Sequence, residues 1–247
     1  MSNLPLMLDK RFVQTKTTLL HLTKLALKDW QAASLIIRVK RTRLTFLSTA
    51  ALIDLYNAAK IIEHQQIAGI FIEAGCALGG STLVIAAAKS PRRPFYIYDT
   101  FEQIPPPSEK DGPDAHRRYQ EIITGQAKGP GNTLYYGYRG DLLPHVKTTF
   151  AAYGFTPIKD NLHFIKGLFQ ETMHVDKPVA LAHIDGDWYD SVMTCLERIV
   201  PNLQVGGRLI IDDYESWSGC RRAVDEFFQE RDGFEFQIKA RLHIRRV

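Results

Sequence analysis

The sequence predicts an α/β domain in which a mostly parallel sheet carries helices on both faces. Two observations predict it: short apolar runs look like buried strands from residue 69 onward, and helical segments alternate with them. The expected strands are GIFIEAG (69–75), PFYIYD (94–99), NLHFIKG (161–167), VALAHID (179–185) and GRLIIDD (207–213). The expected crossover helices are STLVIAAAKS (81–90), SVMTCLERIV (191–200) and CRRAVDEFFQERD (220–232).

Two further segments flank this core. Leucines and isoleucines at mixed three- and four-residue spacings predict helices over about 17–66, so residues 1–66 are expected to form a helical extension of the domain at 67–247. The basic run RVKRTR (38–43) is expected to be a solvated helix face. The tail, residues 233–247, alternates apolar and polar residues, as an antiparallel edge hairpin would.

Length and composition fit one soluble domain. The 247 residues are 45% hydrophobic and 23% charged, and the formal charge of +4 does not imply a polyanionic partner. Three cysteines lie far apart and form no CxxC pair, which argues against a disulfide framework or a zinc site. The first residues are too polar for a signal peptide, and no run approaches the roughly 20 apolar residues of a membrane span. We therefore expect a cytoplasmic protein with no membrane contact, and homo-oligomer formation is left open.

A glycine-rich turn follows the first strand, in FIEAGCALGGST (71–82). A phosphate-binding P-loop is excluded, because Ser81 occupies the place of its lysine. The dinucleotide fingerprint matches only in part, because Ala77 replaces its middle glycine. Asp99 ends the second strand about 20 residues later, where a carboxylate can bind ribose hydroxyls or cap a helix. Since NAD and S-adenosylmethionine both present a ribose, Asp99 leaves the choice open, whereas Glu73 in its buried strand suits a cationic cofactor.

Carboxylates gather where the fourth and fifth strands end, in HIDGDWYDS and GGRLIIDDYE. Ligands bind at the carboxyl edge of such sheets, and neighbouring carboxylates repel each other unless a cation joins them. We therefore expect Asp185, Asp212 and Asp213 to bind Mg²⁺, whereas Asp190 is expected to cap a helix. Asp187 projects to the same side as Asp185 and is the expected proton acceptor, although Asp185 could do both jobs.

The connection over residues 102–139 is rich in Pro, Gly and polar residues and is longer than an ordinary connection. Long loops of this kind are usually lids, binding loops or disordered segments, and we expect a lid over the acceptor, with subunit contact as the alternative. Polar and aromatic contacts are expected from Arg117, Arg118, Tyr119, Tyr135, Tyr136 and Tyr138.

Several of these motifs together resemble the macrocin and novobiocin-type sugar O-methyltransferases. The matching pieces, in order, are E-x-G with GGS (73–81), DTFEQIPPP (99–107), KGLFQET (166–172), IDGDWYDS (184–191), GGRLIIDDY (206–214) and GCRRAVDEF (219–227). Cys76–Leu78 departs from the Trp- and Arg-containing segment usual in that family, and residues 108–139 match poorly. These two departures concern the acceptor rather than the chemistry.

The resemblance implies a Rossmann-like class I methyltransferase that uses S-adenosylmethionine and Mg²⁺ to methylate a hydroxyl of a sugar or glycosylated small molecule. The residues expected to bind the cofactor are Glu73, Gly75, Ser81, Asp99 and, from the nearby helix, Thr49. A catechol or phenol remains the alternative acceptor, since two vicinal oxygens on Mg²⁺ look alike in either substrate. An NAD-dependent oxidoreductase would leave the acidic cluster unexplained, and an RNA methyltransferase is disfavoured because no dense basic stripe interleaves with aromatic residues.

Overall fold

The computed structural model describes residues 19–247, and the first 18 residues of the expected N-terminal extension lie outside this range. Its centre is one seven-stranded sheet with the order β3-β2-β1-β4-β5-β7-β6. The first five strands run parallel, and β7 runs antiparallel to both β5 and β6, which confirms the predicted sheet and C-terminal hairpin. The strands are β1 (Ile70–Ala74), β2 (Phe95–Asp99), β3 (Leu162–Lys166), β4 (Val179–Ile184), β5 (Leu203–Ile211), β6 (Phe234–Ile238) and β7 (Leu242–Arg246).

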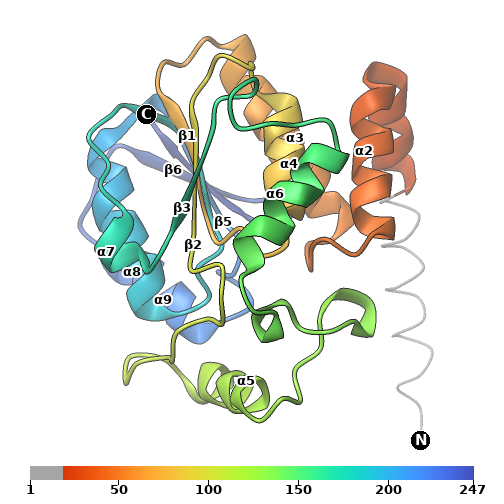
Figure 1. The fold of residues 1–247 in the computed structure, drawn as a ribbon. Helices are drawn as coiled ribbons and strands as arrows, with labels where there is room; N and C mark the ends of the chain where they lie inside the picture. Colours follow the sequence, from red (N-terminus) through yellow and green to blue (C-terminus); the bar gives the residue numbers. More distant parts are fainter. Residues whose placement is uncertain (1–18) are drawn as a thin grey trace, which may run out of the picture.

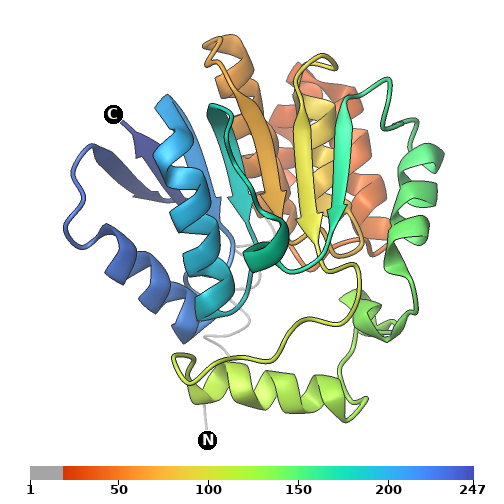
Figure 2. The ribbon, with the colours of Figure 1, turned by 60° about the vertical axis from the view of Figure 1, so that its left-hand side comes forward.

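Helices cover both faces of the sheet (Figures 1 and 2). One face packs against α2, α3, α4 and α6, and the other against α7, α8 and α9. Each face of the sheet has its own hydrophobic core. Successive side chains of β1 point to opposite faces, so Phe71 packs in the core beneath α2, α3, α4 and α6, and Ile72 packs in the core beneath α7, α8 and α9. The helices are α2 (Trp30–Arg41), α3 (Thr49–His64), α4 (Gly80–Ala88), α5 (Pro113–Ile123), α6 (Leu142–Ala152), α7 (Phe169–Thr172), α8 (Tyr189–Ile199) and α9 (Ser218–Phe228).

The basic run at 38–43 is partly engaged within the fold. The Arg38 guanidinium lies 3.7 Å from the ring centroid of Tyr153 and donates a hydrogen bond to the carbonyl of Ala152. The Lys40 ammonium donates to the carbonyl of Leu47. These side chains tie α2 to its surroundings, so the run is only in part the solvated helix face that the sequence predicted.

The segment 102–139 contains more regular structure than the sequence suggested. It includes the helix α5, which begins directly after Gly112 with Pro113 at its first position. Only Ala115 and Ile122 of this helix are buried, so its apolar face is too short to produce a clear helical period. Two 3₁₀ turns, η1 (Pro130–Asn132) and η2 (Tyr136–Tyr138), follow, and a third, η3 (Val200–Asn202), lies between α8 and β5.

The lid, defined here as residues 102–139, crosses the molecule beyond the carboxyl ends of the parallel strands (Figure 2). It therefore faces the edge of the sheet where the sequence predicted the site. Within residues 19–247, no helix combines the length and apolar composition that a membrane span requires.

Candidate functional site

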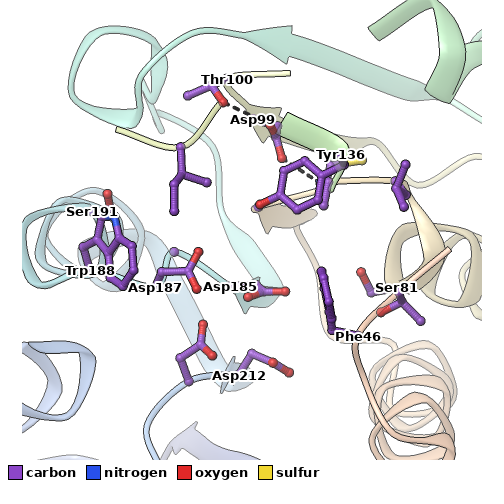
Figure 3. A pocket seen from close by; sticks show the side chains of 18 of the residues that line it. Phe46, Ser81, Asp99, Thr100, Tyr136, Asp185, Asp187, Trp188, Ser191 and Asp212 are labelled. Atoms are coloured by element: carbon purple, nitrogen blue, oxygen red, sulfur yellow. Dashed lines mark hydrogen bonds between the residues drawn. The ribbon is translucent and has the colours of Figure 1, made fainter. Parts of the chain in front are cut away.

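A cavity of about 580 Å³ lies between the carboxyl edge of the sheet and the lid. Its walls come from the loop 44–47, the glycine-rich turn after β1, the ends of β2, β4 and β5, and the lid. Figure 3 shows side chains from these separate elements turned toward one space. The volume suits a ligand of the size of a drug molecule or larger.

The glycine-rich turn and β2 form one end of this cavity. The Asp99 carboxylate accepts hydrogen bonds from the backbone N–H groups of Ala77 at 2.7 Å and Phe101 at 2.6 Å. Burial raises the pKa of Asp99, and the backbone hydrogen bonds oppose that rise. Because a carboxylate can accept about four hydrogen bonds, Asp99 retains capacity for ribose hydroxyls while it holds the turn in place.

Gly75 lies where the turn touches the end of β4. Its φ is +97°, and a Cβ atom there would lie 1.9 Å from the carbonyl oxygen of Asp185. Only glycine permits this approach without a backbone shift. The cofactor turn and the acidic motif of β4 are therefore in direct backbone contact, and Ser81 of α4 lines the same cavity.

Four carboxylates meet at the ends of β4 and β5, as the sequence predicted, and all four line the cavity. Carboxylate oxygens of Asp185, Asp187 and Asp213 lie within 4.8 Å of one another. Burial and mutual repulsion raise the pKa values of Asp185 and Asp213 well above the ordinary value. The Oδ2 atom of Asp213 is buried and has no hydrogen-bond partner among residues 19–247. A set of carboxylate oxygens that includes an unsatisfied buried hydrogen-bond acceptor fits a hard divalent cation.

Asp212 differs from its neighbours because two cations of the chain contact it. Its Oδ1 accepts a hydrogen bond from Arg241 Nε at 2.6 Å and lies 3.5 Å from His183 Nε2. The other ring nitrogen of His183 lies 2.9 Å from Glu73 Oε1, in a fully buried pair. Although burial raises the pKa of Asp212, His183 and Arg241 lower it below the ordinary value.

The contacting side chains form a row across the sheet, in the order Glu73, His183, Asp212 and Arg241. Glu73 and His183 are register partners on β1 and β4, Asp212 follows β5, and Arg241 precedes β7. Although burial lowers the pKa of His183, the flanking carboxylates raise it to about 9. The row thus neutralises the charge of Asp212, whereas no cationic side chain of the described residues forms an ion pair with Asp185, Asp187 or Asp213.

Asp187 has an unusual backbone conformation, and among the described residues one side chain donates a hydrogen bond to it. Its φ of +54° lies in the left-handed region, which non-glycine residues rarely adopt. Trp217 Nε1 donates a hydrogen bond to its Oδ1 at 3.0 Å. Burial raises the pKa of Asp187 to about 6, in part offset by the Trp217 hydrogen bond. A carboxylate with such a pKa is suited to accept a proton near neutral pH.

The lid closes the other side of the cavity and is bound to the helices behind the acidic motifs. Asp111 Oδ1 accepts from the N–H of Tyr189 at 2.8 Å, which caps α8. Asp114 accepts from the N–H and hydroxyl of Ser218 at 2.8 and 2.6 Å, which caps α9. On the cavity side, the lid supplies mainly apolar and aromatic surface together with one cation, from Ile104, Pro105, Arg118, Ile122, Pro130, Tyr135 and Tyr136.

Most of the residues singled out from sequence line this cavity: Gly75, Ser81, Asp99, Asp185, Asp187, Asp212 and Asp213. Glu73 lies behind the cavity and is joined through His183 to Asp212, which lines it. Thr49 begins α3 and does not line the cavity, whereas the preceding residues 44–47 do. Arg241 and Trp217 were missed, because each reaches its aspartate across about 30 residues of chain and no local pattern marks that contact.

Comparison with known proteins agrees with this geometry. A profile described as Macrocin-O-methyltransferase (TylF) matches residues 29–239. The 8-demethyl-8-(2,3-dimethoxy-alpha-L-rhamnosyl)-tetracenomycin-C 4'-O-methyltransferase of Streptomyces olivaceus is 28% identical over 189 residues, which are 74% of this chain and 67% of that protein. The mycinamicin III 3''-O-methyltransferase of Micromonospora griseorubida is 27% identical over 204 residues, which are 78% and 73% of the two chains.

Solved structures show the same fold. The O-methyltransferase NovP superposes with a TM-score of 0.69 at 21% identity, over 82% of each chain. The calicheamicin methyltransferase CalS11 superposes with a TM-score of 0.61 at 18% identity, over 94% of this chain and 92% of that one. At these identities the superpositions establish the Rossmann-like class I methyltransferase fold and leave the acceptor to be argued from the site.

Proposed function

The chain belongs to the macrocin O-methyltransferase family, and on that premise we propose that it transfers the methyl group of S-adenosylmethionine to a sugar hydroxyl of a glycosylated small molecule, with Mg²⁺. The observation that carries the proposal is a single cavity. In it, the glycine-rich turn at Gly75 and the carboxylate of Asp99 at the end of β2 face the four aspartates at the ends of β4 and β5. A cationic methyl donor suits the negative charge of this cavity, and an acceptor oxygen suits a metal-binding cluster. Ser81 lines the same cavity and is a further proposed cofactor residue, whereas Glu73 and Thr49 are proposed to support the cofactor site from outside the cavity wall, Glu73 through His183 and Thr49 from the start of α3.

The carboxylates divide into two roles in this proposal. Asp185, Asp212 and Asp213 would hold Mg²⁺, and the unpartnered Oδ2 of Asp213 together with the raised pKa values of Asp185 and Asp213 supports the fit. When bound, Mg²⁺ lowers the pKa of a coordinated hydroxyl. For Asp212 only Oδ2 remains uncommitted, because Arg241 occupies Oδ1.

Asp187 acts as the base. It accepts the proton of the acceptor hydroxyl as the new oxygen–carbon bond forms and the sulfur–carbon bond of the donor breaks, which leaves neutral S-adenosylhomocysteine. Its pKa of about 6 keeps it ionised at neutral pH and close enough in basicity to take the proton. The cavity and lid hold the two reactants in line, which supplies much of the rate.

The sugar assignment comes from the relatives and from the lid. The two curated relatives carry names that specify a 4'-hydroxyl and a 3''-hydroxyl as methylation sites on tetracenomycin- and mycinamicin-type molecules. The lid adds aromatic surface from Tyr135 and Tyr136 and one cation, Arg118, around an opening suited to a sugar with an apolar aglycone. A catechol or phenol is the second candidate, because the acidic cluster serves vicinal phenolic oxygens equally well.

The test is a methyl-transfer assay across glycosides, catechols, amines and RNA, with Mg²⁺ or with excess chelator. We expect methylation of glycosides that requires the metal. Faster methylation of catechols would overturn the sugar assignment and keep the chemistry. Methylation of amines alone, in chelator, would overturn both. Calorimetry should detect S-adenosylmethionine binding and no NAD binding.

The roles of the carboxylates can be separated without turnover. Mn²⁺ binding, followed by electron paramagnetic resonance, should weaken strongly in Asp185→Asn and Asp213→Asn and persist in Asp187→Asn. Loss of Mn²⁺ binding in Asp187→Asn would instead make Asp187 a metal ligand, which the close approach of Asp185, Asp187 and Asp213 also allows. The proton would then pass to another group.

The cellular location and the division of the chain into segments are part of the same proposal. A cytoplasmic location is supported by Cys76, Cys195 and Cys220, all buried and unpaired, as expected in a reducing compartment. The division into an extension at 1–66 and a methyltransferase domain at 67–247, within one domain overall, is likewise proposed.

A further inference from the structure

Trp217 is placed to fix the orientation of the Asp187 side chain. An indole has one rigid N–H donor, and that of Trp217 is directed at Oδ1 of Asp187 at 3.0 Å. Both residues line the cavity, so the contact lies where the acceptor would bind. Because one carboxylate oxygen is held in this way, the other keeps a defined direction as a proton acceptor.

The backbone at Asp187 adopts a strained conformation. It follows Gly186 in the connection between β4 and α8, and its φ of +54° is a conformation that costs a non-glycine residue free energy. The backbone there is held on one side by the 2.6 Å hydrogen bond from the Trp188 N–H to the carbonyl of Gly186. The side chain has Trp217 as its hydrogen-bond donor among the described residues.

The lid in turn holds Trp217. Trp217 is the N-cap residue of α9, and the next residue, Ser218, donates two hydrogen bonds to the lid carboxylate of Asp114. The rings of Trp217 and Trp188 pack edge to face with centroids 5.4 Å apart. Trp188 Nε1 donates to the lid carbonyl of Pro105 at 2.9 Å. Two lid contacts therefore converge on the indole that holds Asp187.

We propose that Trp217 is a positioning residue for Asp187, and that docking of the lid through Asp114 and Ser218 holds Trp217 in place. Proton acceptance is thereby coupled to closure of the lid over the acceptor. The inference rests on the proposed function, in which Asp187 is the base. It goes beyond that function by linking the base to a lid segment that does not itself touch the reacting atoms.

The first experiment needs no substrate. The chain has three tryptophans, Trp30, Trp188 and Trp217, so a ¹⁵N-indole spectrum contains three side-chain signals, each assigned by its loss in the corresponding Phe variant. We expect Asp187→Ala and Asp114→Ala each to shift the Trp217 signal and to leave that of Trp30, which lies exposed on α2, unchanged. An unmoved Trp217 signal in Asp187→Ala, or in Asp114→Ala, would overturn the corresponding link.

The second experiment measures methyl transfer. Trp217→Phe keeps an aromatic ring but removes the indole N–H donor, so kcat should fall about 10- to 100-fold, the usual effect of losing a hydrogen bond to a charged group. The KM for S-adenosylmethionine and the Mn²⁺ affinity should stay within about twofold, because neither depends on the Asp187 orientation. Trp30→Phe, a substitution of the same kind remote from the site, should leave kcat unchanged.

A double-mutant cycle tests the coupling. If Asp114 acts through Trp217, the kcat losses of Asp114→Ala and Trp217→Phe should be strongly non-additive. Additive losses would mean that the lid acts independently and would overturn the coupling, and an unchanged kcat in Trp217→Phe would overturn the positioning role. If no hydroxyl acceptor is methylated by the wild-type protein, the proposed function fails, and the indole spectra alone still decide whether lid, Trp217 and Asp187 are linked.

Discussion

Replacement of Gly75 by alanine should uncouple the cofactor turn from the acidic motif. The new Cβ would lie 1.9 Å from the carbonyl oxygen of Asp185, whereas such contacts are essentially never below 3.0 Å. The turn and the end of β4 must therefore separate by roughly 1 Å. A misplacement of about 1 Å in a site can reduce rate by about 100-fold, and we expect a similar loss in affinity for S-adenosylmethionine.

A matched control separates this clash from backbone strain. Gly125 also has a positive φ, +74°, but a Cβ there meets nothing within 4 Å. Gly125→Ala thus introduces only the left-handed strain, about 1–2 kcal/mol in the free energy of unfolding. Gly75→Ala adds the displacement of two chain segments to a strain of the same kind, so it should be the less stable of the two variants.

Calorimetric titration with S-adenosylhomocysteine and urea unfolding measure the two quantities. We expect ligand affinity close to wild type in Gly125→Ala and about 100-fold weaker in Gly75→Ala, in line with the misplacement estimate. If Gly75→Ala binds the ligand within about threefold of Gly125→Ala, roughly 0.6 kcal/mol, then the close approach to Asp185 does not set the cofactor site.

Three further predictions concern the charges around the site. Asp213→Asn should raise the thermal stability of the metal-free protein by relieving carboxylate repulsion, and should remove the stabilisation that Mg²⁺ gives the wild type; a lower metal-free Tm would contradict this. Arg241→Met should cost about 2 kcal/mol in urea unfolding, because Asp212 loses a charge-assisted hydrogen bond, and an unchanged midpoint would refute it. Burial raises the pKa of Asp114, but hydrogen bonds from Ser218 bring it below 3.8, so its stabilisation of the lid is present above about pH 4 and lost in more acidic solution. Pepsin cleavage within 102–139 should therefore increase from about pH 5 to pH 3 in the wild type, and this increase should be smaller in Asp114→Asn.

The sheet and the acidic cluster were predictable because both follow from local pattern. Apolar runs such as 179–185 identify parallel strands, and parallel strands bring their carboxyl ends to one edge, so the aspartates of two distant motifs had to meet there. Asp99 was found by the same reasoning. For these residues, position along the strand determines position in the site.

The contacts that tune the cluster could not be predicted in this way. Arg241 lies at the hairpin before β7 and looks like any solvated arginine in sequence, but the pairing of β7 with β5 brings it beside Asp212. Helix α5 was missed for a different reason: it buries two residues and is held by contacts at its ends, such as that of Asp114 with Ser218, rather than by an apolar stripe. Both depend on tertiary neighbours that local periodicity does not encode.

The position of β7 has a consequence for the order in which the protein can fold during synthesis. Although β7 follows the six other described strands along the chain, it occupies an interior place in the sheet, between β5 and β6. Until β7 has emerged, β5 presents an open edge and Asp212 lacks its guanidinium partner. A nascent chain that stops short of β7 should therefore expose a sheet edge beside a half-neutralised anionic cavity, the kind of surface that chaperones must shield until β7 has emerged.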